Sequence, residues 1–281
     1  MRGKLCVITG ATSGIGLVAA EELAAMGARL MLVGRDRERG EAALRRIRGR
    51  TPGADAVILY ADLSRLSEMN RVAGEIAAAA PRIDVLINNA GAMFQRRSVT
   101  EDGFERTFAL NHLAYFVLSN RLKDRLAAAA PARIVSVASE AHRGNRLDFA
   151  DLQAERNYRA LAVYGRSKLA NILFTREMAR RLAGTGVTAN CLHPGFVASR
   201  FGDNNPGLMG MGIGIAKRLF AISPEKGAET IVYLASSPEV AQASGGYFAK
   251  CRAAVPSAEA QDDAAARRLW AESAKLAKMA V

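Results

Sequence analysis

The segment that most restricts the fold of this chain is a glycine-rich turn, Thr9-Gly10-Ala11-Thr12-Ser13-Gly14-Ile15-Gly16, placed between two segments of different periodicity. The apolar run Leu5–Ile8 before it is typical of a buried parallel strand. The residues from Leu17 to Met26 carry apolar side chains at helical spacing and end at Gly27. This context predicts a dinucleotide site, because glycines let the backbone approach a pyrophosphate and a helix N-terminus offers free N–H groups. A tight turn without a ligand is the alternative.

Strand-like and helix-like patterns alternate along the whole chain, which is typical of a parallel sheet with crossover helices. Half of the residues are hydrophobic, and the sequence contains no linker, low-complexity tract or internal repeat. We therefore predict one α/β domain over residues 1–281: a Rossmann-type, doubly wound, seven-stranded parallel sheet with helices on both faces. Strands are expected near 4–9, 29–33, 55–60, 84–88, 132–137, 187–192 and 246–248, and helices near 15–26, 36–48, 65–79, 102–129, 161–184, 225–236 and 258–276.

The net charge of +12 raises the question of nucleic acid as a partner. The arginines occur as dispersed pairs, such as Arg45-Arg46 and Arg180-Arg181, mostly on polar helix faces and without interleaved aromatic residues. This distribution favours a solvated surface, which can also attract an anionic cofactor, and no nucleic-acid partner is expected.

The cysteines and the hydropathy pattern bear on the compartment. The three cysteines are widely spaced, which favours reduced thiols over a disulfide frame or a metal site. No apolar stretch reaches the ~18 residues that suggest a membrane span, and no N-terminal signal region is recognised. A cytoplasmic protein without an integral span and without a metal is expected.

Three long connections follow strands: residues 92–100, 140–160 and 198–222. Long connections in a compact domain usually carry function, and these leave the same edge of a parallel sheet. We predict that they form the walls of a substrate cleft. The third contains a Gly/Met run at 207–214, which we interpret as a closing lid; contact with a membrane surface or a loop packed on the body are the alternatives.

The segment Tyr164-Gly-Arg-Ser-Lys168 places a phenol and an ammonium on one face of a predicted helix. A phenol titrates near pH ~10, and a nearby cation lowers that pKa toward the working range, so the pair can move a proton to or from a substrate oxygen. Tyr-x-x-x-Lys is a weak pattern by itself. Two further segments converge on the same sheet edge: Asp84–Gly91, a strand that enters a small-residue turn, and Arg133–Ser139, a strand that ends in a hydroxyl.

Taken in order, TGATSGIG, NNAG, Asn111 in a helix, Ser139 after a strand, YGRSK and His193-Pro194-Gly195 resemble the short-chain dehydrogenase/reductase family. The resemblance covers essentially the whole chain. It extends to the retinol-dehydrogenase-like branch through the segments 149–158 and 167–175 and the tail with Gly246, Cys251, Trp270 and Ser273.

The resemblance implies four catalytic residues. Tyr164 is expected to act as general acid/base, Lys168 to lower the pKa of Tyr164 and bind the nicotinamide ribose, and Ser139 to stabilise charge on the substrate oxygen. Asn111 is expected to hold a water that links Lys168 to solvent. Ser139 lies 25 positions before Tyr164, more than in most of the family, and we interpret the extra length as a feature of the branch. Ser136 is rejected as the catalytic serine because it lies on the other face of the strand.

Cofactor preference depends on the end of the second strand, Gly34-Arg35-Asp36. Gly34 stands where NAD-specific sites carry an acid, and Arg35 is placed to pair with a 2′-phosphate, so NADP(H) is predicted over NAD(H). Asp36 is interpreted as the N-cap of the next helix, with ribose binding as the alternative. The other cofactor contacts that the resemblance implies are Gly10, Thr12, Ser13, Gly14, Ile15, Gly16, Asp62, Leu63, Asn88, Ala90, Gly91, Tyr164, Lys168, Pro194, Gly195, Val197 and Ser199.

The leading prediction is an NADP(H)-dependent oxidoreductase that interconverts an alcohol and an aldehyde or ketone on an apolar substrate, either retinal-like or of a broader kind. An NADP(H)-binding sensor without turnover is the alternative, and the intact Ser/Tyr/Lys set argues against it. Epimerase or dehydratase chemistry on nucleotide sugars is disfavoured, because it predicts a larger C-terminal domain. The substrate pocket is predicted to include Met93, Phe94, Phe196, Leu208 and Met209.

A homodimer or homotetramer is also expected. The helices near 102–129 and 161–184 match those that often pair across a two-fold axis in the family. They carry apolar residues beyond the needs of one core face: Leu113, Phe116, Leu173 and Phe174.

Overall fold

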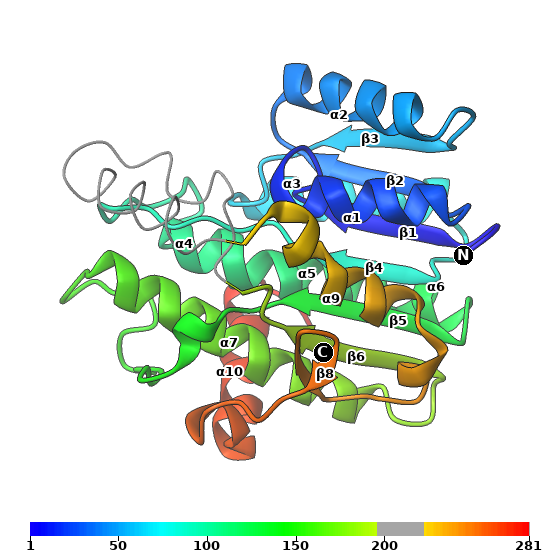
Figure 1. Ribbon diagram of the computed structural model, residues 1–281. Helices are drawn as coiled ribbons and strands as arrows, with labels where there is room; N and C mark the ends of the chain where they lie inside the picture. The colour runs from blue at the N-terminus through cyan, green and yellow to red at the C-terminus, as the bar shows by residue number, and fades with distance from the viewer. Residues whose placement is uncertain (196–221, 281) are drawn as a thin grey trace.

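The computed structural model describes residues 1–195 and 222–280, and its strands and helices alternate along the chain (Figure 1). The strands are β1 Leu5–Thr9, β2 Arg29–Gly34, β3 Ala56–Tyr60, β4 Val85–Asn88, β5 Ala132–Val137, β6 Val187–Leu192, β7 Tyr247–Ala249 and β8 Arg252–Ala253. The helices are α1 Gly14–Ala25, α2 Arg37–Arg50, α3 Leu66–Ala79, α4 Arg106–Phe108, α5 Ala114–Arg121, α6 Lys123–Ala127, α7 Ala160–Arg181, α9 Pro224–Ser236 and α10 Asp263–Leu276.

The described strands form one sheet in the order β3-β2-β1-β4-β5-β6-β7-β8. Every neighbouring pair is parallel except β7 and β8, which are antiparallel. The doubly wound α/β architecture is confirmed, but the predicted number of seven strands was one too low. The eighth strand is two residues long and exposed, so it leaves no periodic pattern in the sequence. The chain reaches it by a turn at Lys250 and Cys251, both at positive φ.

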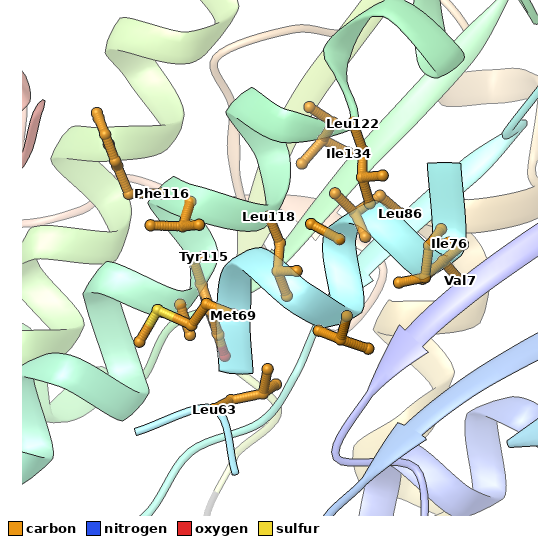
Figure 2. Packing of buried hydrophobic residues seen from close by; sticks show 14 of the residues in the cluster. Val7, Leu63, Met69, Ile76, Leu86, Tyr115, Phe116, Leu118, Leu122 and Ile134 are labelled. Carbon is orange, nitrogen blue, oxygen red and sulfur yellow. The ribbon is translucent and has the colours of Figure 1, made fainter. Parts of the chain in front are cut away.

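The sheet is buried on both faces, as β1 illustrates. Its residues Cys6 and Ile8 belong to a core packed by α1, α2 and α9, whereas Leu5 and Val7 belong to a second core packed by α3, α5 and α7. Figure 2 shows part of the second core, with side chains from α3 and α5 meeting those of β4 and β5. Because successive strand residues point to opposite faces, an unbroken apolar strand requires helices on both sides.

The position of the site follows from the strand order. Strand β1 pairs with β2 on one side and with β4 on the other. The chain therefore builds the sheet outward from β1 through β2 to β3, then returns to add β4 on the opposite side of β1. Ligands of open α/β sheets bind in the crevice at such a reversal, outside the carboxyl ends of the strands. The glycine-rich turn after β1 and the NNAG turn after β4 therefore lie together.

The single helix predicted over 102–129 was wrong. The helical region begins at Arg106, passes through a π-helical turn, Ala109–Leu113, and is interrupted again at Leu122. The start is set by Glu105, whose buried carboxylate accepts the backbone N–H groups of Thr107 and Phe108, both at 2.7 Å. Caps and tertiary contacts of this kind interrupt a segment whose local periodicity is helical throughout.

The apolar residues behind the predicted oligomer interface are buried inside the chain itself. Phe116 and Phe174 are at most 2% exposed, and Leu113 and Leu173 are equally buried. The indole of Trp270, on α10, stacks on the ring of Phe174 at a centroid distance of 6.0 Å and meets Phe116 edge-on at 4.9 Å. Helix α10 thus covers these side chains, and they do not support the predicted dimer or tetramer. Within the described ranges, every helix is too short or too polar to span a bilayer.

Candidate active site

The turns after β1 and β4 interlock through glycines that have no room for a side chain. Gly10 has φ +66°, and a Cβ on it would lie 2.8 Å from the Cα of Ala90. A Cβ on Gly16 would lie 2.3 Å from Nδ2 of Asn89. Any larger residue at either position would force the two turns apart, which explains the glycines in physical terms.

Two residues that the sequence interpretation did not assign to the site hold these turns together. Asn89 donates through Nδ2 to the carbonyls of Thr9 and Gly10, at 2.9 and 3.1 Å. The Thr9 hydroxyl oxygen accepts the backbone N–H groups of Asn89 and Ala90, at 2.9 and 3.0 Å. Both residues lie inside the recognised motifs, but only their contacts across 80 residues reveal this role.

The N-terminus of α1 fits an anionic group. Its N-cap, Ser13, makes no side-chain capping bond, and no acidic residue lies in the first turn. Uncapped N–H groups and the positive end of the helix dipole favour a phosphate at this position. A dinucleotide pyrophosphate therefore fits the turn that contains Thr12, Gly14 and Ile15, and a cofactor site here is supported by the backbone itself.

The end of β2 shows why position 34 carries no acid. A Cβ on Gly34 would lie 2.4 Å from the Thr12 methyl group, so the turn leaves no space for a carboxylate side chain. Asp36 caps α2 by accepting the Arg39 N–H at 2.9 Å, as its N-cap interpretation predicts. The Arg35 guanidinium is exposed and lies 3.9 Å from the Asp62 carboxylate. Asp62 in turn accepts from the backbone and hydroxyl of Ser64, at 3.0 and 2.7 Å.

Three predicted cofactor residues have buried side chains, so they could contact a cofactor mainly through their backbone atoms. Asn88 is fully buried and donates through Nδ2 to the Ser119 hydroxyl at 2.9 Å, so its side chain lies in the core. Leu63 and Ala90 are also buried. Gly91 is exposed, and a Cβ on it would lie 3.3 Å from Lys168 Nζ, which places this turn beside the lysine of α7.

Helix α7 brings Tyr164 and Lys168 together. Lys168 Nζ lies 5.7 Å from the centre of the Tyr164 ring and equally far from that of Tyr115, and it donates to the Val137 carbonyl at 2.9 Å. The lysine is only 3% exposed, and burial without a charged partner lowers its pKa to about 7. The ammonium is thus held by a neutral carbonyl at the end of β5.

The phenol of Tyr164 behaves differently from the sequence expectation. Burial raises its pKa to about 12, and a hydrogen bond with Ser139 opposes this only in part. Without a cofactor the phenol therefore keeps its proton at neutral pH, which suits the donation of a proton to a carbonyl oxygen. Ser139 begins the 3-10 turn η2, Glu140–His142, and its hydroxyl also accepts the Ala141 N–H at 3.2 Å. Ser136, which the sequence analysis rejects as the catalytic serine, is fully buried.

Asn111 lies in the π-helical turn, and all of its side-chain groups bond within the protein. Its Nδ2 donates to the Ala92 carbonyl and to the Ser167 hydroxyl, both at 2.9 Å, and its Oδ1 accepts the Ala92 N–H at 2.8 Å. Ser167 in turn donates to the Tyr164 carbonyl at 2.7 Å. Asn111 therefore connects the segment after the NNAG turn to helix α7, and Ser167 is a linking residue that the motif pattern did not indicate.

The first two connections pack against each other on the substrate side. The Tyr158 hydroxyl donates to the Phe94 carbonyl at 2.7 Å, and the Arg106 guanidinium covers the Phe94 ring at 4.5 Å. Met93 is buried, and Pro194 and Gly195 follow β6 at the same edge of the sheet. A cavity of about 10 Å³ lies between the 140–160 connection and α7, and neither Met93 nor Phe94, the two predicted pocket residues that the structure describes, lines it. Val197, Ser199, Phe196, Leu208 and Met209, and the interpretation of 207–214 as a lid, lie outside the described residues.

A glycine-rich turn at the reversal point of a doubly wound sheet, together with Ser139, Tyr164 and Lys168 at the same sheet edge, is typical of Rossmann-fold oxidoreductases. The family model for short chain dehydrogenases matches residues 4–206, and the chain belongs to this family. It is retinol-dehydrogenase-like: human retinol dehydrogenase 13 is 44% identical over 280 residues, covering 98% of this chain and 84% of the relative. Family and relatives support oxidoreduction between alcohols and carbonyl compounds.

Solved structures support the same fold. An uncharacterised protein from Mycobacterium paratuberculosis aligns with TM-score 0.80 and 33% identity, covering 99% of this chain and 94% of that chain. The NADP complex of RhlG from Pseudomonas aeruginosa aligns with TM-score 0.70 and 26% identity, covering 88% of this chain and 94% of that one.

Proposed function

We propose that this protein is an NADP(H)-dependent oxidoreductase that interconverts an apolar alcohol and the corresponding aldehyde or ketone, with Tyr164 as general acid/base. The observation that carries the proposal is the convergence of a buried phenol, a hydroxyl and an ammonium beside the cofactor turn: Ser139 bonds Tyr164, and Lys168 lies one helical turn further along α7. When bound, the nicotinamide cofactor supplies or accepts the hydride.

Each residue has a task that its surroundings support. The protonated Tyr164 donates its proton to the substrate oxygen during reduction, and Ser139 hydrogen-bonds the same oxygen as charge develops on it. Lys168, with its pKa near neutrality, is available to bond the nicotinamide ribose and to supply charge next to the phenol. Alcohol oxidation requires the phenolate, so it depends on a further lowering of the Tyr164 pKa by the positive charge of the oxidised cofactor.

The preference for NADP(H) rests on three features of the adenosine end. Position 34 has no room for an acid, Asp36 is engaged as a helix cap, and the exposed Arg35 guanidinium lies 3.9 Å from the Asp62 carboxylate. A bidentate interaction with a 2′-phosphate would satisfy Arg35 better than this contact does. The NADP complex of a structural relative is consistent with this preference.

The substrate class and the setting are proposed more broadly. The similarity to retinol dehydrogenases suggests retinal-like aldehydes, and the apolar Met93 and Phe94 suit them as well as other apolar carbonyl compounds. All three cysteines are free, which agrees with a reducing, cytoplasmic setting.

The experiment measures NADPH and NADH oxidation against a panel of apolar aldehydes and ketones, with wild type, Tyr164→Phe and Arg35→Ala side by side. We expect turnover with NADPH, loss of turnover in Tyr164→Phe with NADPH binding retained, and a loss of preference for NADPH in Arg35→Ala. Tight NADPH binding without turnover across the panel would contradict the enzymatic proposal for apolar carbonyl compounds. Equal use of NADH by wild type would contradict the cofactor assignment.

A further inference from the structure

The segment after catalytic Ser139 makes a charged contact that the proposed chemistry does not use. Glu140 Oε2 lies 3.4 Å from Nε2 of His193 and accepts the Tyr247 hydroxyl at 3.2 Å. Its other oxygen is bonded by Arg143. Glu140 comes from η2 after β5, His193 follows β6, and Tyr247 begins β7, so one carboxylate joins the segments that follow β5 and β6 to the first residue of β7.

The hydrogen bonds define the state of the His193 ring. Its Nδ1 accepts the Gly195 N–H at 3.1 Å, so in the neutral ring the proton is on Nε2, the nitrogen that lies 3.4 Å from Glu140. The backbone N–H of His193 donates to Phe248 at 3.0 Å, and the ring stacks on Tyr247 at 5.9 Å. Glu140 is therefore in contact with a residue that also closes the turn through Pro194 and Gly195.

His142 holds the backbone of the turn that carries Glu140. Its Nδ1 donates to the Ser139 carbonyl at 2.7 Å and its Nε2 accepts the Ser257 N–H at 3.1 Å, so both nitrogens are used by a neutral ring. The segment from Ser139 to His142 is thus tied to the loop after β8. Glu140 sits on a turn whose backbone is held in place.

We propose that Glu140 and His193 are positioning residues, whose contact keeps the His193–Gly195 turn in register with the hydroxyl of Ser139. This inference rests on the function proposed above, in which Ser139 holds the substrate oxygen and the turn borders the nicotinamide pocket. Hydride transfer depends on the distance and angle between the substrate carbonyl, which Ser139 holds, and the nicotinamide, which the turn borders. Small displacements of either group reduce the rate strongly. Glu140 and His193 act through these groups and touch no reacting atom.

The test is a double-mutant cycle with Glu140→Ala and His193→Asn. The asparagine oxygen can still accept the Gly195 N–H but cannot reach Glu140. We expect each single variant to lower kcat about 10-fold, and the double variant to lose no more than either single variant. The Kd for NADPH should change less than about 3-fold in all three. Glu140→Gln, which keeps an acceptor for Nε2–H, should recover most of the loss.

The control is Arg29→Ala, which removes an exposed side chain that lies 2.8 Å from Asp55 at the amino end of β2, away from the site. It should leave kcat unchanged. Losses that multiply in the double variant, or a loss in Glu140→Gln equal to that in Glu140→Ala, would overturn the proposal. A loss in Arg29→Ala as large as in Glu140→Ala would overturn it too.

A second readout separates this inference from the proposed function. Nitrogen NMR of the three histidines, without cofactor, reports the tautomer and the pKa of each ring. We expect an Nε2–H tautomer for His193. Its pKa is lowered by burial and by Arg143 and Lys250, and is supported by Glu140, so Glu140→Ala should lower it further. If the His193 pKa is unchanged in Glu140→Ala, the proposed contact is wrong. If that pKa falls as expected but the wild type shows no turnover, only the proposed oxidoreductase function is wrong.

Discussion

The two halves of helix α7 both bury a charged side chain, but they treat it in opposite ways. Near the C-terminal end, Glu177 is 3% exposed and bonded by Arg180 and Arg181, at 2.5 and 2.7 Å, three and four residues further along the helix. Near the N-terminal end, Lys168 is equally buried, and the described part of the chain gives it a neutral carbonyl and two aromatic rings in place of a carboxylate.

This difference in partners shifts the pKa of the two groups for different reasons. Burial raises the pKa of Glu177, but the hydrogen bonds of the two arginines outweigh that effect and the net shift is downward, so the carboxylate stays ionised. Burial alone acts on Lys168 and brings its pKa to about 7. A buried charge with local partners stabilises a fold, whereas one without them has its proton affinity tuned and is typical of a functional site.

The largest effect is expected from Tyr164→Phe in the N-terminal half. Removal of the phenolic hydroxyl should lower kcat by between about 10²- and 10⁴-fold, the usual contribution of a general acid/base. NADPH binding, measured by fluorescence titration, should remain. Substantial turnover in this variant would remove the functional assignment of this half of the helix.

Trp270→Ala tests the C-terminal half, where α10 covers α7. The indole is 4% exposed and stacks on Phe174, and the Arg181 guanidinium lies over it at 4.3 Å. We expect a loss of about 3–5 kcal/mol in the free energy of unfolding, measured with urea, because a large cavity opens in the core. Val255→Ala, at an exposed position, serves as the control and should cost almost nothing. A loss below about 1 kcal/mol in Trp270→Ala would show that α10 is only loosely attached.

Lys168→Met tests whether the lysine charge is unpaired. The folded pKa of about 7 lies below the ordinary value of 10.5, so between these pH values the unfolded chain binds more protons and raising the pH stabilises the fold. Below pH 7 the folded protein carries the full free-energy cost of burying the Lys168 ammonium. We expect the variant to be more stable than wild type at pH 6 by about 3 kcal/mol, less than the full pKa difference at about 1.4 kcal/mol per unit, because local relaxation reduces the cost of burial.

The measurement for Lys168→Met is urea unfolding of both proteins without cofactor, at pH values from 6 to 10. The stability difference should shrink as the pH rises through this range. A variant that is less stable than wild type at every pH would mean that the ammonium has a charged partner in solution.

Glu177→Gln should give the smallest effect. Both arginines are partly exposed and regain water when the carboxylate is lost, so we expect a loss of about 1 kcal/mol in the free energy of unfolding. The value of kcat should not change. A lowered kcat with unaltered stability would reverse the roles assigned to the two halves of α7.

Much of the fold could be predicted from the sequence because the deciding signals are local. The apolar run before Thr9, the glycines after it and the alternation of strand and helix patterns specify a doubly wound sheet. The same patterns placed Ser139, Tyr164 and Lys168 near one edge, because parallel strands end on the same side. Local patterns failed where long-range contacts decide, as in the interrupted helix over 102–129 and the two-residue strand β8.

The chemistry of the site needed the tertiary structure. Spacing indicated that Lys168 would lower the pKa of Tyr164, but spacing carries no information on burial, and in the folded chain burial raises that pKa. The spacing of Phe116 and Phe174 likewise indicated an oligomer interface, but in the folded chain both rings pack against Trp270, which is distant in sequence.

The sequence by itself determined the doubly wound α/β architecture and the placement of Ser139, Tyr164 and Lys168 toward one edge of the sheet, since these follow from short-range periodicity and motif order. Only the tertiary structure decided the charge states of Tyr164 and Lys168 and the contact between Glu140 and His193. The physical reason is that desolvation and hydrogen bonding depend on which side chains surround a group, and those neighbours are far apart along the chain.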